Sequence, residues 1–412
     1  MFPGTTADDR PRGMEPGVTR EIGAAASING HCRAPRGRSA LKSGRFAIEI
    51  HRDPRAIEAD WALLEQHGAP TPFQTRAWLR PVYELLAPAL KASPLFVLVR
   101  DAASGDPAML LPLCVRRRLG VGVVEFADFG VCDYNAPLLS ATFDPAPREW
   151  ATLWEDIVSL ICFAPVMRFV KLPAMIQDRA NPLVLGGRAL EMPFGCWGVP
   201  LPSRIEDFDA RVLASKFGRD LARSRRRLAE RGKIEYVCAA TREEALEIFA
   251  ALARQRQARC DEMGRRDALA APAYRRFYEA AISAGLEQRL TSVSALKVDG
   301  AIIGAMLALR HGRSRLVLMP SFEGGEWRRY SPGNLMIRRA IEQFIAEGAR
   351  YFDLTIGDEA YKRAFGASRE PLYHEMRPLT ALGKVVSMAA PWAIGLKEAL
   401  SRKNRPRPAA SR

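Results

Sequence analysis

Residues 301–362 carry the pattern that most constrains how this chain can fold. Apolar strand-like runs are followed by Ser331, Pro332 and Gly333, and apolar residues then recur at helical spacing. Ser331 suits the N-cap of this helix and Pro332 its first position. An alternating run at 350–356 predicts a further strand. The expected order of strand, turn, helix and strand is typical of an α/β sheet.

The turn before this helix is predicted to bind an anion. A glycine in the first helical turn lets backbone N–H groups approach a ligand, and the positive end of the helix dipole favours negative charge. We predict that acetyl-CoA or another acyl-CoA binds here through its pyrophosphate, as a co-substrate. The residues assigned to this contact are Ser331, Pro332, Gly333, Asn334 and Leu335.

The strand at 350–356 ends in residues that suit catalysis. Asp353 is expected on the strand face opposite to the side chains of Phe352, Leu354 and Ile356. Transfer of an acyl group from a thioester to an amine or hydroxyl needs a base for the acceptor proton. We predict that Asp353 is this base. The alternative is a structural carboxylate that hydrogen-bonds a neighbouring loop.

A short helix is predicted after this strand, with Asp358 as its N-cap. Asp358 is also included among the predicted substrate contacts. Tyr361 is expected in the first turns of the helix, and Lys362 beside it is predicted to contact substrate or phosphate.

The run SPGNLMIRRAIEQFIAEGARYFDLTIGDEAYKRAFG at 331–366 resembles the carboxy-terminal half of the CelD-type acetyltransferases. These are GNAT-fold proteins related to the FemAB peptidyltransferases and are often encoded beside cellulose or exopolysaccharide genes. PFQTRAWL at 72–79 extends the resemblance over residues 46–385. It implies an α/β fold of two tandem GNAT-like domains, each a mixed sheet flanked by helices. It also implies that Tyr361 lies near the CoA sulfur and protonates the departing thiolate.

Length and composition predict two domains, because 412 residues with 48% hydrophobic side chains are too many for one ordinary core. A segment rich in glycine and proline at 180–202 contains the expected boundary. Only the second half is assigned the acyl donor, because no glycine opens the amphipathic helix expected at 148–162. The predicted organisation is a disordered basic segment at 1–45, a degenerate GNAT-like domain at 46–190, a GNAT domain with the acyl-CoA site at 191–396, and a basic disordered tail at 397–412.

The net charge of +15 is concentrated at the two ends of the chain and in residues 216–233. On a helical wheel this middle window separates a basic face from an apolar stripe of Phe217, Leu221, Ser224 and Leu228. Because clustered like charges repel, the basic face is predicted to bind an anionic acceptor, far from the acyl-CoA turn. A solvated basic surface is the alternative. The members of the basic face are Lys216, Arg219, Arg223, Arg226 and Arg227.

In the first half, Asp133 and Tyr134 follow a strand-like run. They are predicted to face the substrate from a loop, and a turn without function is the alternative.

Seven single cysteines without metal-ligand spacing predict a cytoplasmic protein that needs no metal. An apolar run at 385–396 is shorter than the ~20 residues that a bilayer requires. Because basic residues follow it, a peripheral contact with the inner face of the membrane is one interpretation. A terminal helix packed on the second domain is the other.

The favoured function is an acyltransferase that moves an acetyl or acyl group from acyl-CoA to an amine or hydroxyl of a sugar, polysaccharide or envelope precursor. Its partner is then a small molecule or glycan of anionic character, and no DNA is expected. Two alternatives stay open. One is FemAB-like transfer of an amino acid from aminoacyl-tRNA, which the basic face would suit, and the other is a non-catalytic accessory protein of polysaccharide synthesis.

Overall fold

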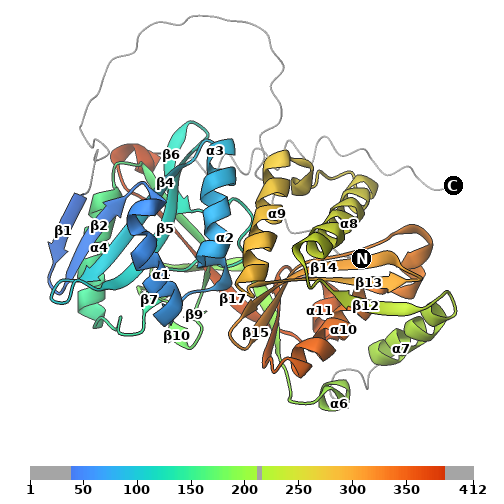
Figure 1. The fold of residues 1–412 in the computed structure, drawn as a ribbon. Coiled ribbons are helices and arrows are strands. Elements are labelled where there is room, and N and C mark those ends of the chain that lie inside the picture. Colours follow the sequence, from blue (N-terminus) through green and yellow to red (C-terminus); the bar gives the residue numbers. More distant parts are fainter. Residues whose placement is uncertain (1–38, 211–215, 386–412) are drawn as a thin grey trace, which may run out of the picture.

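The computed structural model describes residues 39–210 and 216–385 (Figure 1). Within them, 15 strands form one mixed sheet, and helices cover both of its faces. The main path through the sheet is β1-β2-β4-β5-β6-β8-β17-β11-β16-β15-β14-β13-β12. The predicted α/β class is therefore confirmed.

The first half of the chain builds one side of this sheet. Its strands are β1 (Ser39–Ser43), β2 (Phe46–His51), β3 (Gly68–Ala69), β4 (Ser93–Asp101), β5 (Pro107–Arg118), β6 (Val121–Phe126), β7 (Leu138–Ser140) and β8 (Val166–Pro173). Strands β6 and β8 run parallel, whereas the other pairs along this side are antiparallel.

Helices cover both faces of this first half. One face carries η1 (Pro54–Ile57), α1 (Glu58–His67), η2 (Pro72–Gln74), α2 (Arg76–Pro81), η3 (Val82–Leu86) and α3 (Ala87–Ala89). The other face carries α4 (Pro147–Ile161), which begins with Pro147 at its first position. The remaining elements are β9 (Met175–Ile176), β10 (Arg179–Ala180) and α5 (Pro182–Leu185).

The second half builds the other side of the sheet. Its strands are β11 (Leu190–Pro200), β12 (Ile234–Cys238), β13 (Thr291–Val298), β14 (Ala301–His311), β15 (Ser314–Phe322), β16 (Tyr351–Ile356) and β17 (Ser368–Pro378). Its helices are α6 (Ile205–Phe208), α7 (Lys216–Ala229), α8 (Arg242–Glu262), η5 (Ala268–Ala270), α9 (Pro272–Glu287), η6 (Gly325–Tyr330), α10 (Pro332–Ala346) and α11 (Ala360–Ala364). Helices α8 and α9 lie on one face, and α7 and α10 lie on the other (Figure 1).

Strand β17 joins the two sides. It pairs with β8 of the first half and with β11 of the second, antiparallel to both. The last described strand of the chain is therefore the one that makes the sheet continuous.

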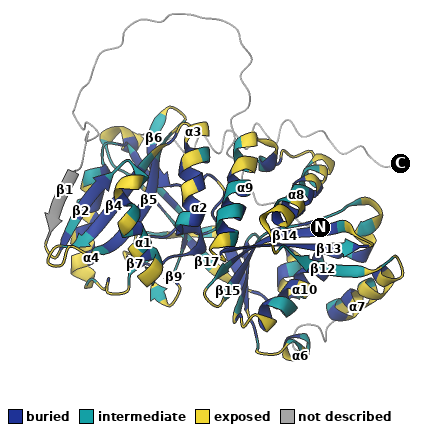
Figure 2. Cartoon of the chain, in the orientation of Figure 1, coloured by how far each residue is buried: buried dark blue, intermediate teal, exposed yellow. Residues whose placement is uncertain are grey.

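Three apolar clusters hold the layers together, and strands β4, β5, β13 and β14 are largely buried (Figure 2). One cluster lies under α4, and another lies under α7 and α10. The third is shared, because α1, α2 and η3 of the first half pack in the same cluster as α8 and α9 of the second. The fully buried ring of Trp78 meets Phe277 edge-on, with the ring centroids 5.3 Å apart. The two halves thus share a core.

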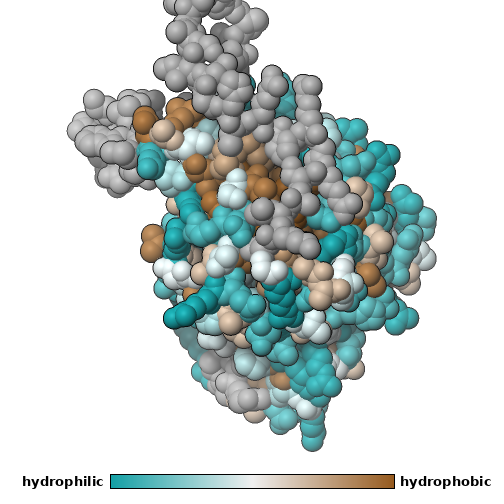
Figure 3. All heavy atoms as spheres, turned by 90° about the vertical axis from the view of Figure 1, so that its left-hand side faces the viewer, coloured by the Kyte–Doolittle hydropathy of each residue, from teal (hydrophilic) through white to brown (hydrophobic). Residues whose placement is uncertain are grey.

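None of the described helices is long and apolar enough to cross a bilayer. On the face of the first half shown in Figure 3, hydrophilic residues cover most of the surface, and hydrophobic residues gather toward its upper part. Residues 1–38, nearly all of the apolar run predicted at 385–396 and the basic tail at 397–412 lie outside the described residues. Within the segment predicted to be disordered at 1–45, Ser39–Ser43 form strand β1, which pairs with β2.

Candidate active site

A cavity of about 1130 Å³ lies between the two halves. The first half lines it with parts of β5, β6 and β8 and with the loop at 128–135. The second half lines it with the end of α8, with η5, with the start of α9 and with the corner at 356–359. A cavity walled by two packed domains is a common place for a ligand site.

The corner begins where two parallel strands part. The pairing of β15 with β16 ends at Leu316 and Asp353, although both strands continue beyond these residues. Thr355 has φ of 58°, which is a strained value for a β-branched residue. Its backbone N–H donates to Asp353 Oδ1 at 2.7 Å, and its hydroxyl donates to the carbonyl of Val317 at 3.2 Å. The Thr355 side chain therefore links β16 to β15 beyond the last pair of residues joined by the backbone.

The left-handed turn at Thr355 also corrects one expectation. Phe352 and Leu354 pack in the cluster under α10, as the alternation predicted. Ile356 packs instead against the shared cluster. Because Thr355 interrupts the strand geometry, the side-chain alternation stops there and Ile356 lies on the other side.

Asp353 is hydrogen-bonded to a residue of the other half. The Tyr134 hydroxyl lies 2.8 Å from Asp353 Oδ1 and 2.7 Å from Oδ2, and both side chains are buried. Burial raises the pKa of Asp353 to about 7, while the hydrogen bond from Tyr134 lowers it. The structure thus brings together Asp353 and Tyr134, which the sequence singled out separately.

Asp133 lines the cavity, whereas Asp353 does not. Burial raises the pKa of Asp133, and Lys171 and the Thr355 side chain oppose this effect. The charge of Asp133 also raises the pKa of Asp353. Burial is the largest cause of the raised pKa for both carboxyls.

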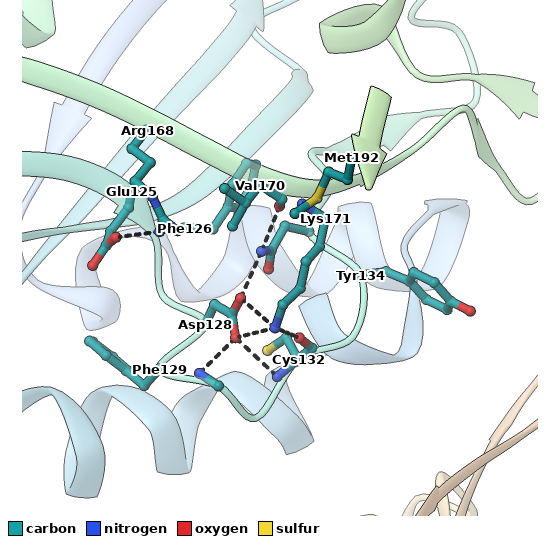
Figure 4. Close-up of polar contacts among 12 residues, drawn as sticks. Glu125, Phe126, Asp128, Phe129, Cys132, Tyr134, Arg168, Val170, Lys171 and Met192 are labelled. Carbon is teal, nitrogen blue, oxygen red and sulfur yellow. Dashed lines mark hydrogen bonds and ion pairs between the residues drawn. The ribbon is translucent and has the colours of Figure 1, made fainter. Parts of the chain in front are cut away.

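The loop that presents Asp133 is held by a buried ion pair (Figure 4). Lys171 Nζ lies 3.0 Å from Asp128 Oδ2 and donates to the carbonyl of Cys132 at 2.7 Å. Asp128 also accepts from the Asn135 side chain at 3.0 Å and from the backbone of Gly130 at 2.8 Å. Sequence reasoning missed this pair, and its one signal was a lysine inside the apolar strand β8.

The structure gives Lys362 a place inside the corner. Its ammonium is buried and donates to the carbonyls of Thr355, Ile356 and Gly357 at 3.2, 2.8 and 3.1 Å. Glu359 Oε2 lies 3.0 Å from the same nitrogen. An ammonium has three hydrogens, and four acceptors surround this one, so none is left for a substrate.

Asp358 lies in the cavity wall and accepts from the Trp197 indole at 3.0 Å. Its predicted capping role is wrong, because Glu359 occupies the N-cap position of α11. Tyr361 packs in the cluster under α10 and does not line the cavity. Burial raises the pKa of Tyr361. The phenol is therefore protonated at neutral pH.

The predicted donor turn begins α10 with Pro332 at its first position. Ser331 occupies the N-cap position in a left-handed conformation, but its side chain makes no capping hydrogen bond, contrary to expectation. Asn334 Oδ1 is buried without a hydrogen-bond partner, and Leu335 packs in the core. The first N–H groups of a helix have no acceptor within it. Helical N–H groups without a side-chain cap fit a bound phosphate group.

Helix α7 divides as predicted, with Leu221 and Leu228 buried and all five basic residues of its predicted basic face exposed. The expectation that it lies far from the donor turn is wrong. Helix α7 packs against η6 and α10, because its apolar stripe belongs to the same cluster. Arg227 lies 5.8 Å and Arg329 5.1 Å from the ring centroid of Tyr330, which directly precedes the turn.

The comparisons with known proteins agree with this architecture. Residues 215–363 match the family model described as an acetyltransferase (GNAT) domain. No curated protein sequence matches the chain. Among solved structures, FemX is similar at a TM-score of 0.51 and 11% identity, over 77% of this chain and 95% of that one.

Two further solved structures are more distant. L-PGS from Bacillus licheniformis has a TM-score of 0.48 and 11% identity, over 84% of this chain and 97% of that one. A tandem GNAT protein from the clavulanic acid biosynthesis pathway has a TM-score of 0.43 and 12% identity, over 81% and 99%. The chain therefore shares its α/β fold with FemX, and residues 215–363 match a GNAT acetyltransferase domain.

Proposed function

We propose that this protein is an acyltransferase that moves an acyl group from acyl-CoA to an amine or hydroxyl acceptor bound in the cavity between its halves. Acyl-CoA supplies an activated acyl group as a thioester. The resemblance to CelD-type proteins favours an acceptor among sugars, glycans and envelope precursors.

One observation carries this proposal. Tyr134 of the first half and Asp353 of the second are hydrogen-bonded at the point where β15 and β16 part, and Asp133 faces the cavity beside them. A carboxylate whose pKa is about 7 can accept a proton at neutral pH and release it again. Strained backbone, shifted pKa values and a cavity in one place favour a catalytic centre.

In the proposed reaction, the acceptor nitrogen or oxygen bonds to the acyl carbon while the bond between that carbon and sulfur breaks. The acceptor proton moves to the carboxylate pair, which Asp133 presents to the cavity. The uncapped N–H groups of α10, with Arg227 and Arg329 nearby, would hold the pyrophosphate. Tyr361 stays the predicted acid for the thiolate, because its raised pKa keeps it protonated.

The direct test is acceptor-dependent release of free CoA thiol. The protein is incubated with acetyl-CoA and a panel of amines and amino sugars, and products are identified by the mass of an added acetyl group. We expect thiol release that needs an acceptor, and protection against thermal unfolding by acetyl-CoA alone. Absence of both effects would exclude acyl-CoA as the donor.

Removing the hydroxyl that contacts Asp353 should shift the pH dependence. The Tyr134 hydrogen bond lowers the pKa of Asp353, so Tyr134→Phe should move the inflection of kcat/KM from about 7 to higher pH. The matched control is Tyr83→Phe, a buried tyrosine whose hydroxyl donates to the Leu113 carbonyl at 3.0 Å. An inflection that stays in place in Tyr134→Phe would remove Asp353 from the pH dependence.

A second candidate donor is aminoacyl-tRNA, favoured by the exposed basic face of α7 beside the donor turn. Binding of tRNA without binding of acetyl-CoA would support it. Binding of neither would support the non-catalytic alternative.

Arg227 separates these candidates, because its guanidinium lies 5.8 Å from the ring centroid of Tyr330, next to the donor turn. Arg227→Glu should weaken acetyl-CoA binding by about tenfold or more, as expected for losing a charged contact and adding a repulsive one. The control Arg223→Glu, whose parent side chain lies 3.6 Å from Asp220 on the same exposed face, should leave that affinity unchanged. Equal effects of the two variants on acetyl-CoA would contradict a local contact and indicate a general field. Calorimetry at two salt concentrations measures the acetyl-CoA affinity of both variants.

A further inference from the structure

A cluster of three arginines lies in the cavity wall, apart from the carboxylate pair. Arg116 and Arg118 come from β5, Glu125 from β6 and Arg168 from β8, on adjacent strands. Glu125 lies 3.0 Å from Arg116 Nε, 3.0 Å from Arg118 Nε and 3.5 Å from Arg168 Nη1. One carboxylate thus faces three guanidinium groups.

Arg116 and Arg168 by themselves carry two positive charges against the single negative charge of Glu125. Glu125 is only 6% exposed, so it is fixed among the arginines and contributes a single negative charge. Arg116 Nε is buried and makes no hydrogen bond despite its distance to Glu125. Half-buried guanidinium groups held around one carboxylate present a ready surface for a second planar or tetrahedral anion.

The opposite charge lies elsewhere in the same cavity. Figure 4 shows Glu125 and Arg168 on one side of the Asp128–Lys171 pair and Tyr134 on the other. Tyr134 is hydrogen-bonded to Asp353, so it shows where that carboxyl lies. Asp133, the residue before Tyr134 in the chain, faces the cavity. In all, six basic and seven acidic residues line the cavity, so its selectivity depends on where the charges lie and not on their sum.

We propose that the Arg116, Arg118 and Arg168 cluster binds an anionic group of the acceptor. The acceptor is then an amine that also carries a carboxylate or phosphate, with the amine directed to Asp133 and the anion to the arginines. The position of the amine next to Asp133 rests on the proposed function. The anion subsite itself does not depend on which donor the protein uses.

Three small amines test the subsite: phosphoethanolamine, β-alanine and ethanolamine. They share a primary amine and differ in carrying a phosphate, a carboxylate or no anion. Binding is measured by calorimetry without any acyl donor. We expect at least one of the two anionic amines to bind and ethanolamine not to bind, and the stronger anion identifies the chemistry preferred.

Substitutions then locate the contact. Arg168→Gln and Arg118→Gln should each weaken binding of the anionic amine by about tenfold, the loss expected for one charge-assisted contact. Arg100→Gln is the matched control, because Arg100 is similarly exposed, lies 2.6 Å from Asp60 Oδ1 and 3.4 Å from Glu49 Oε1, and does not line the cavity.

A variant that is expected to strengthen binding separates loss of the contact from damage to the fold. Glu125→Gln removes the competing carboxylate and should tighten binding of the anionic amine. Equal binding of all three amines, an equal effect of Arg100→Gln, or weaker binding in Glu125→Gln would each overturn the proposal. Retained binding of the anionic amine without any acyl transfer would instead refute the proposed function and leave the subsite standing.

Discussion

Asp353→Asn should lower kcat/KM by about 10²- to 10⁴-fold, the range that one positioned general base contributes. Asn keeps the shape of the side chain and can still accept from Tyr134, so the geometry of the corner should persist. The wild-type rate should rise with pH through about 7, where Asp353 loses its proton, and the variant should show no such inflection. Stopped assays of thiol release across pH 5–9 measure both.

The same carboxyl has a predictable effect on stability. Folding raises its pKa from an ordinary 3.8 to about 7, so the folded state binds more protons than the unfolded state between these values. The stability of the wild type should therefore fall as pH rises through this window, and the fall should be smaller in Asp353→Asn. A variant that keeps wild-type activity, or melts with the same pH dependence as the wild type, would leave Asp353 without the role assigned to it.

Lys362→Met should destabilise the protein by about 3–5 kcal/mol, the usual result of removing one member of a buried ion pair. Methionine fills much of the space of the lysine stem but supplies no hydrogen. Three carbonyls of the corner and the Glu359 carboxylate would then be buried without their donor. Denaturant unfolding measures the loss, and activity should fall with it because the corner carries Thr355 and Asp353.

A second lysine provides the control for this prediction. Lys233 also pairs with a glutamate, at 2.8 Å from Glu235, but the pair is exposed. Lys233→Met should leave the denaturation midpoint unchanged, since exposed pairs contribute little. A Lys362→Met protein as stable as its parent would show that the corner is held by other contacts.

Most elements whose apolar residues recur at regular spacing could be predicted from the sequence. The strands that connect the two halves could not. Helices α4 and α10 and strand β16 have the regular spacing of buried elements and were predicted closely. Strands β11 and β17 were not predicted, because prolines and glycines normally argue against a strand. Gly198 in β11 is needed there, since a Cβ at this position would overlap the Tyr351 hydroxyl.

For the candidate site, single residues were predictable and their grouping was not. Asp353, Asp133 and Tyr134 were each selected from local pattern, but a contact across 219 residues of chain has no local signal. The position of α7 beside the donor turn and the enclosed position of Lys362 likewise follow from tertiary packing. The arginine cluster was missed because its arginines come from two strands, β5 and β8, and meet only around Glu125 of β6.

The place of β17 has a consequence for how the molecule is made. Residues 368–378 are synthesised after every other described strand, yet they pair with both β8 and β11. Until they leave the ribosome, the nascent chain holds two sheets with open edges, and such edges invite pairing with other chains. Gene fragments cut at the apparent boundary between the halves would share this defect, so each half should express poorly alone. Expression of both halves should recover when β17 is again placed between β8 and β11.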